Sequence, residues 1–174
     1  VILFDRNMES REQVQALTKS LQSLNLNAYR LPLFLAIDQE GGIVTRMKQH
    51  AYTAPPAAEI GQAGKPEDAY RHANETGKDI RALGFNLDFA PVLDIGSRMH
   101  GRCYGTTPQQ VVSFGEQACR GLKDSGVLFT LKHFPGMGRS ETDPHTEKSV
   151  VNVPQQTMLQ EDLLPFRHVI DQYP

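Results

Sequence analysis

The sequence predicts an α/β fold of the (β/α)8 TIM-barrel type, present here as its N-terminal half to two-thirds. Strand-like and helix-like segments alternate without internal repeats or low-complexity linkers, which favours a right-handed α/β fold. Polar residues follow the ends of successive strand-like runs, as in barrels that build one site from many strand ends. A doubly wound sheet would gather them at a single switch point. Such barrels typically have about 250 residues, whereas this chain has 174.

Four apolar runs are expected to form strands. They are residues 1–4, 33–37, 85–93 and 127–131. Three runs are nearly continuous, and the third in chain order is interrupted only by Asn86 and Asp88. Such runs are typical of parallel strands that are buried on both faces of a sheet.

Helices are expected between these strands because capping residues precede amphipathic segments. Ser10 and Gln13 have capping-box spacing, and Gly126 is placed as a C-terminal cap. Pro165 is expected to break or kink the fourth helix. The expected helix starts are Ser10, Lys65-Pro66, Thr107 and Thr157. The expected inner faces are Val14, Leu17, Leu21 and Leu24 in the first helix, and Ala69, Ala73, Ile80 and Leu83 in the second.

The composition argues against several classes of function. Eighteen Lys and Arg against twenty Asp and Glu give a net charge of -2, with no basic footprint for nucleic acid or an anionic membrane. No apolar run is long enough to span a bilayer. Cys103 and Cys119 are expected to be free thiols, with a single disulfide as the alternative. This favours the cytoplasm over the cell envelope or secretion, and no cofactor is expected.

The ends of the chain predict that it is a piece of a longer protein. It begins inside an apolar run without Met and closes on Pro174 after a helix-like stretch. We therefore expect one partial barrel domain over residues 1–174. An open half-barrel would expose an unpaired sheet edge, through which the fragment would self-associate.

Two polar segments directly follow strands and are candidate binding sites. Residues 38–42, Asp-Gln-Glu-Gly-Gly, offer a carboxylate for hydroxyl groups at Asp38 and a tight glycine turn beside a ligand. Arg46 would bind substrate oxygens or hold a carboxylate of this segment. Lys132 and His133 place two donors at the end of the fourth strand. The alternatives are a glycine turn with an ordinary surface ion pair, and a strand end capped by solvated residues.

A third segment carries Asp143 and His145, whose side chains would share a side in an extended stretch. A carboxylate beside an imidazole fixes its tautomer and favours its charged form, as a general acid requires. The alternatives are a solvated turn and a metal site with His133, which lacks compact ligand spacing. Arg102, in the loop before the third helix, either reaches the site or lies on the surface.

Together these motifs resemble the glycoside hydrolase family 3 catalytic domain, most closely its β-N-acetylglucosaminidase branch. The resemblance runs from the apolar start through residues 38–42 and residues 86–94, Asn-Leu-Asp-Phe-Ala-Pro-Val-Leu-Asp. It continues through residues 132–136, Lys-His-Phe-Pro-Gly, to Asp143-x-His145. Each motif is modest alone, but four in order make the resemblance specific.

The resemblance implies a barrel that releases terminal β-linked N-acetylglucosamine with retention of configuration. The substrate would be an N-acetylglucosamine-containing glycoside or a muropeptide, as in peptidoglycan recycling. Asp143 and His145 would form the acid/base dyad. The implied sugar-binding residues are Asp38, Arg46, Arg102, Lys132 and His133. Retaining hydrolysis usually uses two carboxyl groups, so the imidazole of His145 would replace one of them.

The chain departs from the family pattern at two positions. Members of this branch commonly carry His where Met137 stands, and Ser or Thr where Pro144 stands. Pro144 restricts Asp143 to extended geometry, so closure of this loop is expected to differ. The family's nucleophile is an Asp downstream of the dyad, expected beyond Pro174. The fragment by itself is therefore expected to be inactive.

Two alternatives to a hydrolase stay open at this point. A glycoside phosphorylase of the same family would use phosphate as acceptor, because a His acid/base tolerates an anion that a second carboxylate would repel. A non-catalytic carbohydrate-binding module would be favoured if the whole protein lacked the downstream Asp.

Overall fold

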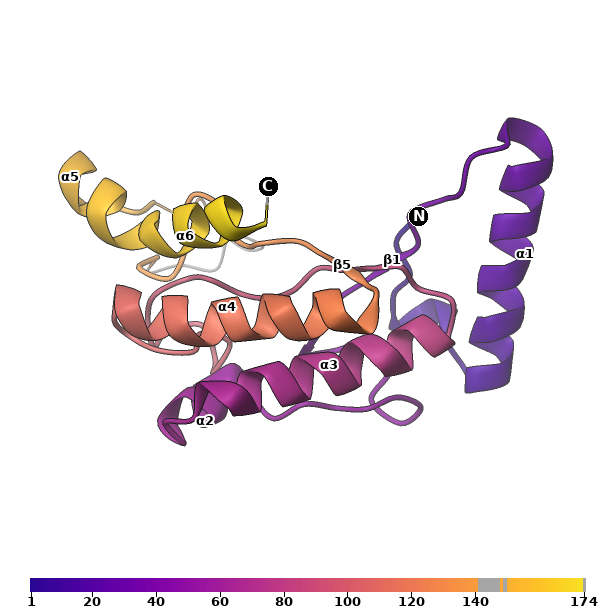
Figure 1. Cartoon of the computed structure of the whole chain (residues 1–174), viewed down its shortest axis with the longest axis horizontal. Helices are drawn as coiled ribbons and strands as arrows, with labels where there is room; N and C mark the ends of the chain where they lie inside the picture. Colours follow the sequence, from indigo (N-terminus) through magenta and orange to yellow (C-terminus); the bar gives the residue numbers. More distant parts are fainter. Residues whose placement is uncertain (141–147, 149, 174) are drawn as a thin grey trace.

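The structure, a computed structural model, alternates strands and helices along the chain. It describes residues 1–140, 148 and 150–173. Its helical elements are η1 (Asp5–Asn7), α1 (Arg11–Tyr29), α2 (Ala57–Gln62), α3 (Pro66–Ala82), α4 (Pro108–Ser125), α5 (Gln155–Thr157), the π-helix η2 (Met158–Asp162) and α6 (Leu164–Gln172). α3 lies beside α4, and α4 beside α6, all three running in the same direction (Figure 1). Over these described ranges, no helix is both long and apolar enough to cross a bilayer.

The central sheet is parallel, and its strands are neighbours in chain order. It consists of β1 (Ala36–Ile37), β4 (Leu87–Asp88) and β5 (Leu128–Phe129). Isolated parallel bridges join Ile2 to Ala36 and Val92 to Lys132, so the first apolar run lies beside β1. All four predicted runs thus contribute to one parallel arrangement, which confirms the predicted α/β class.

The regular strands are shorter than the apolar runs that predicted them. The contact between β1 and β4 ends with the bond from the Phe89 N–H to the Ile37 carbonyl, at 2.9 Å. Pro91, two residues further, has no N–H with which to extend the ladder. The ladder between β1 and β4 therefore ends here, whereas residues 90–93 remain hydrogen-bonded to residues 130–132.

A short hairpin follows β1, where the sequence predicted only a glycine turn. Its strands are β2 (Gln39–Gly41) and β3 (Val44–Thr45), paired antiparallel. Gly41 and Gly42 have φ angles of 100° and 55°, in the region that favours glycine. The predicted turn is confirmed, and the hairpin extends it.

The predicted helix caps at Ser10, Thr107 and Gly126 are confirmed. The Ser10 hydroxyl accepts the backbone N–H of Gln13 at 3.1 Å, and the Thr107 hydroxyl accepts that of Gln110 at 3.4 Å. Gly126 adopts the left-handed conformation, with φ 78°, at the end of α4. The two hydroxyls pair N–H donors that the first turn of a helix leaves free, whereas the Gly126 N–H donates to carbonyls of the last turn of α4.

Two details of the helix prediction are wrong. Leu24 is 69% exposed rather than in the core, because the C-terminal turns of α1 extend clear of α3 and α4 (Figure 1). The last helical segment begins at Gln155, after Pro154, and not at Thr157, whose side chain makes no capping bond. The predicted interruption is confirmed, since η2 separates α5 from α6. Pro165 lies in the first turn of α6, where no N–H is required.

The core lies between the sheet and the helices. On the predicted inner face of α3, Ala69 and Ile80 are 1% exposed or less, and Ala73 is partly buried. Leu83, directly after the helix, is also fully buried. The largest cluster joins α1 to the sheet through Val14, Ile37 and neighbouring residues. This packing fixes the strand ends from which the site is built.

Candidate functional site

The predicted sugar-binding residues meet at the carboxyl ends of the parallel strands. Asp38 follows β1, Arg46 follows β3, Lys132 and His133 follow β5, and Arg102 lies in the loop before α4. The Lys132 ammonium lies 2.8 Å from Asp38 Oδ1, and Arg46 Nη2 lies 3.5 Å from Asp38 Oδ2. Residues separated by 94 positions are thereby brought into contact.

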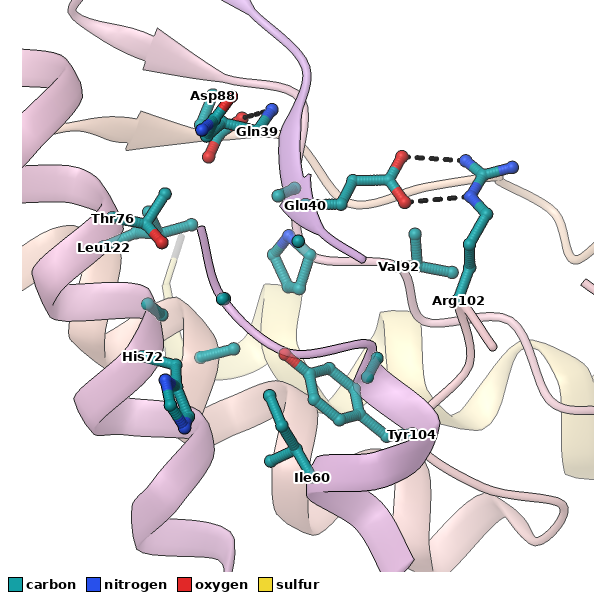
Figure 2. Close-up of a pocket in the computed structure, with 17 residues that line it drawn as sticks. Gln39, Glu40, Ile60, His72, Thr76, Asp88, Val92, Arg102, Tyr104 and Leu122 are labelled. Carbon is teal, nitrogen blue, oxygen red and sulfur yellow. Dashed lines mark hydrogen bonds and ion pairs between the residues drawn. The ribbon is translucent and has the colours of Figure 1, made fainter. Parts of the chain in front are cut away.

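Glu40 contacts two cations of the site, Arg102 and Lys132. Its Oε2 and Oε1 accept hydrogen bonds from Arg102 Nε and Nη2, both at 2.8 Å, and Oε1 lies 2.5 Å from Lys132 Nζ. Figure 2 shows the two-pronged pair with Arg102. Burial alone would lower the pKa of Arg102, but the hydrogen bonds and charge of Glu40 outweigh it and raise that pKa. Arg46 was expected to hold a carboxylate of residues 38–42, and this is confirmed, because it pairs with Asp38 and also with Asp5.

His133 is oriented by a buried carboxylate and by Arg102. Its Nδ1 lies 2.6 Å from Asp94 Oδ2, and its Nε2 lies 3.0 Å from Arg102 Nη2. Because a guanidinium has only donors, Nε2 acts as the acceptor, and the Nδ1 proton is donated to Asp94. This pattern assigns the tautomer that carries its proton on Nδ1.

Asp94 is a site residue that the sequence analysis did not select. It is 1% exposed, and besides His133 it accepts the Met137 backbone N–H at 2.5 Å. Its position directly after residues 85–93 is the same signal that selected Asp38 and Lys132. Any residue except proline supplies this N–H at position 137, so the departure from the family's His leaves the bond intact.

Side-chain exposure separates the residues that a ligand can reach from those that only hold them in place. Asp38, Lys132 and Arg102 side chains are 19%, 13% and 17% exposed, whereas those of Glu40 and Asp94 are 6% and 0% exposed. The accessible groups combine donors and acceptors at fixed positions, which suits a ligand rich in hydroxyl groups. Glu40 and Asp94 instead hold these groups in place.

The remaining candidate residues from the sequence are the proposed dyad, a metal site and the two cysteines. Asp143, Pro144 and His145 lie outside the described residues. Among the residues that the structure does describe, no three His, Cys, Asp or Glu side chains gather to hold a metal ion. Cys103 and Cys119 are free and buried, and burial raises the pKa of the Cys103 thiol to about 12.

A small cavity lies behind the site, between the sheet and the helices. Glu40, Asp88 and Arg102 contribute to its walls together with Thr76 and Leu122 (Figure 2). Asp88 is fully buried, and burial raises its pKa to about 7. Its Oδ1 accepts the Gln39 N–H at 3.0 Å, whereas its Oδ2 has no hydrogen-bond partner among the described residues.

Comparison with known proteins gives a consistent family. Residues 1–173 match the family described as "Glycosyl hydrolase family 3 N terminal domain". Beta-hexosaminidase A of Pseudoalteromonas piscicida is 36% identical over 99% of this chain and 31% of its own length. A beta-hexosaminidase of Xylella fastidiosa (strain M12) is 38% identical over 95% of this chain and 51% of its own length. The chain thus spans about a third to a half of these relatives.

Solved structures give the same result. The family 3 β-N-acetylglucosaminidase of Paenibacillus sp. str. FPU-7 has a TM-score of 0.93 at 39% identity, covering 98% of this chain and 34% of that one. NagZ of Neisseria gonorrhoeae, solved with N-trifluoroacetyl-D-glucosamine, has a TM-score of 0.91 at 27% identity, covering 99% and 52%. The predicted TIM-barrel-type fold is confirmed, with this chain forming part of such a barrel.

Proposed function

The chain belongs to glycosyl hydrolase family 3, and from this premise we propose that the whole protein is a retaining glycosidase that releases terminal β-linked N-acetylglucosamine. The proposal is carried by the cluster of Asp38, Arg102, Lys132 and His133, which presents fixed donors and acceptors at the strand ends. Relatives named as beta-hexosaminidases and β-N-acetylglucosaminidases support the choice of sugar. An N-acetylglucosamine-containing glycoside or muropeptide is the proposed substrate.

The binding cluster would hold the sugar through its hydroxyl groups. Asp38 accepts hydrogen bonds from hydroxyls, whereas Lys132 and Arg102 donate to their oxygens. Because Glu40 and Asp94 fix the cations and the imidazole beforehand, little side-chain freedom is lost on binding. Such preorganisation is the contribution that the described residues make to catalysis.

The acid/base role would fall to His145, with Asp143 as its carboxylate partner. His145 would protonate the leaving oxygen in the first step and deprotonate water in the second. The nucleophile would be a carboxylate beyond Pro174, which forms the glycosyl intermediate that water then hydrolyses. The 174-residue chain alone is therefore expected to hydrolyse nothing.

Arg139 and Ser140, the last described residues before the proposed dyad, are anchored to neighbouring elements. Arg139 Nε donates to both oxygens of the buried Asp162, at 2.9 and 3.0 Å, and its Nη2 contacts Glu161. The Ser140 N–H donates to the Met137 carbonyl at 2.9 Å. These contacts anchor the described chain as far as Ser140.

Hydrolysis of 4-nitrophenyl β-N-acetylglucosaminide by the whole protein tests the proposal. We expect turnover by the wild type, its loss in His145→Ala and Asp143→Ala, and full activity in His168→Ala. His168 is a matched control because it pairs with Glu116 on the helical side, at 3.0 Å. Unchanged rates in both dyad variants would refute the assigned roles.

Two further measurements separate the alternatives. If product forms only with added phosphate, as a glycosyl phosphate, the protein is a phosphorylase. Sugar binding without turnover would favour a carbohydrate-binding module.

Leu128 on β5 is 54% exposed at the end of the described sheet, so the 174-residue chain is expected to self-associate. Light scattering that gave a stable monomer would contradict that expectation.

A further inference from the structure

Asp88 is a buried carboxyl that the proposed mechanism does not use. It lies on β4 with 0% exposure, and it lines the cavity behind the site together with Thr76 and Leu122 of the helical layer (Figure 2). Its Oδ2 is buried without a hydrogen-bond partner among the described residues. A carboxyl in such surroundings is costly to retain, so its other oxygen must matter.

The other oxygen, Oδ1, accepts a hydrogen bond at the point where the ladder between β1 and β4 ends. The last backbone bond between β1 and β4 joins the Phe89 N–H to the Ile37 carbonyl, and Pro91 cannot continue the ladder. Beyond this bond, the backbone N–H of Gln39, just after β1, donates to Asp88 Oδ1 on β4 at 3.0 Å. A side chain thus replaces the backbone acceptor at the point where the chain enters the site.

Gln39 is the residue between the two carboxylates that hold Lys132. Asp38 Oδ1 lies 2.8 Å from Lys132 Nζ, and Glu40 Oε1 lies 2.5 Å from it. A rotation of the backbone at Gln39 would move both carboxylates at once. The side chain of Gln39 is fixed as well, because its Oε1 accepts the Arg46 N–H at 3.0 Å.

We propose that Asp88 is a positioning residue for the sugar site: its bond to the Gln39 N–H sets Asp38 and Glu40 on either side of Lys132. The inference rests on the proposed function for its effect on substrate. It assigns to Asp88 an acceptor oxygen at a fixed place, and no contact with the sugar.

The role requires an oxygen and not a negative charge. Burial raises the pKa of Asp88, the Gln39 N–H and Lys132 lower it, and Asp38 and Glu40 raise it. The pKa of Asp88 thus rises to about 7, so its side chain is neutral in the folded protein below about pH 7. Asparagine keeps both the shape and the acceptor, whereas leucine keeps only the approximate shape.

The test compares Asp88→Asn and Asp88→Leu in the whole protein, with Thr76→Val as a control in the same cavity wall. Circular dichroism establishes folding, kinetics with 4-nitrophenyl β-N-acetylglucosaminide give KM and kcat, and calorimetry gives the Kd for N-acetylglucosamine. We expect Asp88→Asn and Thr76→Val to match the wild type within about twofold. Asp88→Leu should raise KM and Kd about tenfold, since one buried donor loses its acceptor, and should lower kcat less.

Two results would overturn the proposal. One is a folded Asp88→Leu protein with wild-type KM and Kd, and the other is an Asp88→Asn protein impaired as strongly as Asp88→Leu. If Asp88→Leu does not fold, Asp88→Asn decides, because a wild-type KM supports the acceptor role and a raised KM contradicts it.

Failure of the proposed function gives a different pattern. The wild type would then neither hydrolyse the substrate nor bind N-acetylglucosamine. Crystal structures would still judge the positioning role. Lys132 contacts that are lost in Asp88→Leu and kept in Asp88→Asn would support it, and contacts kept in both would overturn it.

Discussion

Removal of the Glu40 charge tests the electrostatic arrangement of the site directly. Glu40 is 6% exposed and contacts Arg102 at 2.8 Å through two bonds and Lys132 at 2.5 Å. Removing one partner from a buried ion pair costs about 3–5 kcal/mol, since the other charge is left uncompensated. Arg102 and Lys132 remain 17% and 13% exposed. Solvent therefore screens part of that charge, and we expect Glu40→Gln to lower the free energy of unfolding by about 3 kcal/mol.

Urea denaturation of the whole protein, followed by far-UV circular dichroism, measures this loss. Glu75→Gln is the matched control, because Glu75 pairs with Lys78 at 3.4 Å on the exposed face of α3. The control should cost less than about 0.5 kcal/mol. The effect of Glu40→Gln should persist in about 1 M NaCl, where exposed pairs are screened. A loss below about 1 kcal/mol, or one equal to the control, would refute the argument.

Two further predictions concern Asp88 and the contact between α3 and α4. The folded-state pKa of Asp88, about 7, exceeds its ordinary value. The unfolded chain therefore loses this proton first, and stability falls as pH rises from about 4 to about 7, by about 4 kcal/mol in total. Asp88→Asn has no such proton and should not show this loss. In urea denaturation, the free energy of unfolding of Asp88→Asn minus that of the wild type should therefore be larger at about pH 8 than at about pH 5. A difference independent of pH would contradict the assignment. A Cβ on Gly121 would lie 2.4 Å from the Tyr70 carbonyl oxygen, so Gly121→Ala should destabilise by about 1–3 kcal/mol. Gly115→Ala, on the same helix, should cost less because it meets only the Leu93 side chain; equal costs in thermal unfolding would refute the close-approach argument.

Local patterns predicted most of the fold. The caps at Ser10, Thr107 and Gly126 depend on neighbouring residues alone, and all three are present. The neighbouring order of the strands follows from their alternation with helices. Leu24 was misplaced because helical periodicity says which face a residue occupies, but not how far the helix extends beyond the sheet.

The site was predictable only in part. Strand-end positions selected Asp38, Lys132 and His133, and the structure brings them together with Arg102. The roles of Glu40 and Asp94 depend on how loops fold back: Arg102 lies 62 positions from Glu40, and His133 lies 39 positions from Asp94. The hydrogen-bonding role of Asp88 depends on where the β1–β4 ladder ends, which the apolar run around it conceals.

The most direct test of the proposed reaction is how the rate of His145→Ala depends on the leaving group. Substrates would be β-N-acetylglucosaminides whose leaving groups range from a simple alcohol to 2,4-dinitrophenol. If His145 is the general acid, its loss should cost about 10²–10⁴-fold with the alcohol, which needs protonation, and much less with dinitrophenol, which leaves as an anion. The comparison uses kcat/KM, which reports the step that releases the leaving group and not the later deprotonation of water. An equal loss of kcat/KM across the series would contradict the account, because it would show that His145 donates no proton to the leaving oxygen.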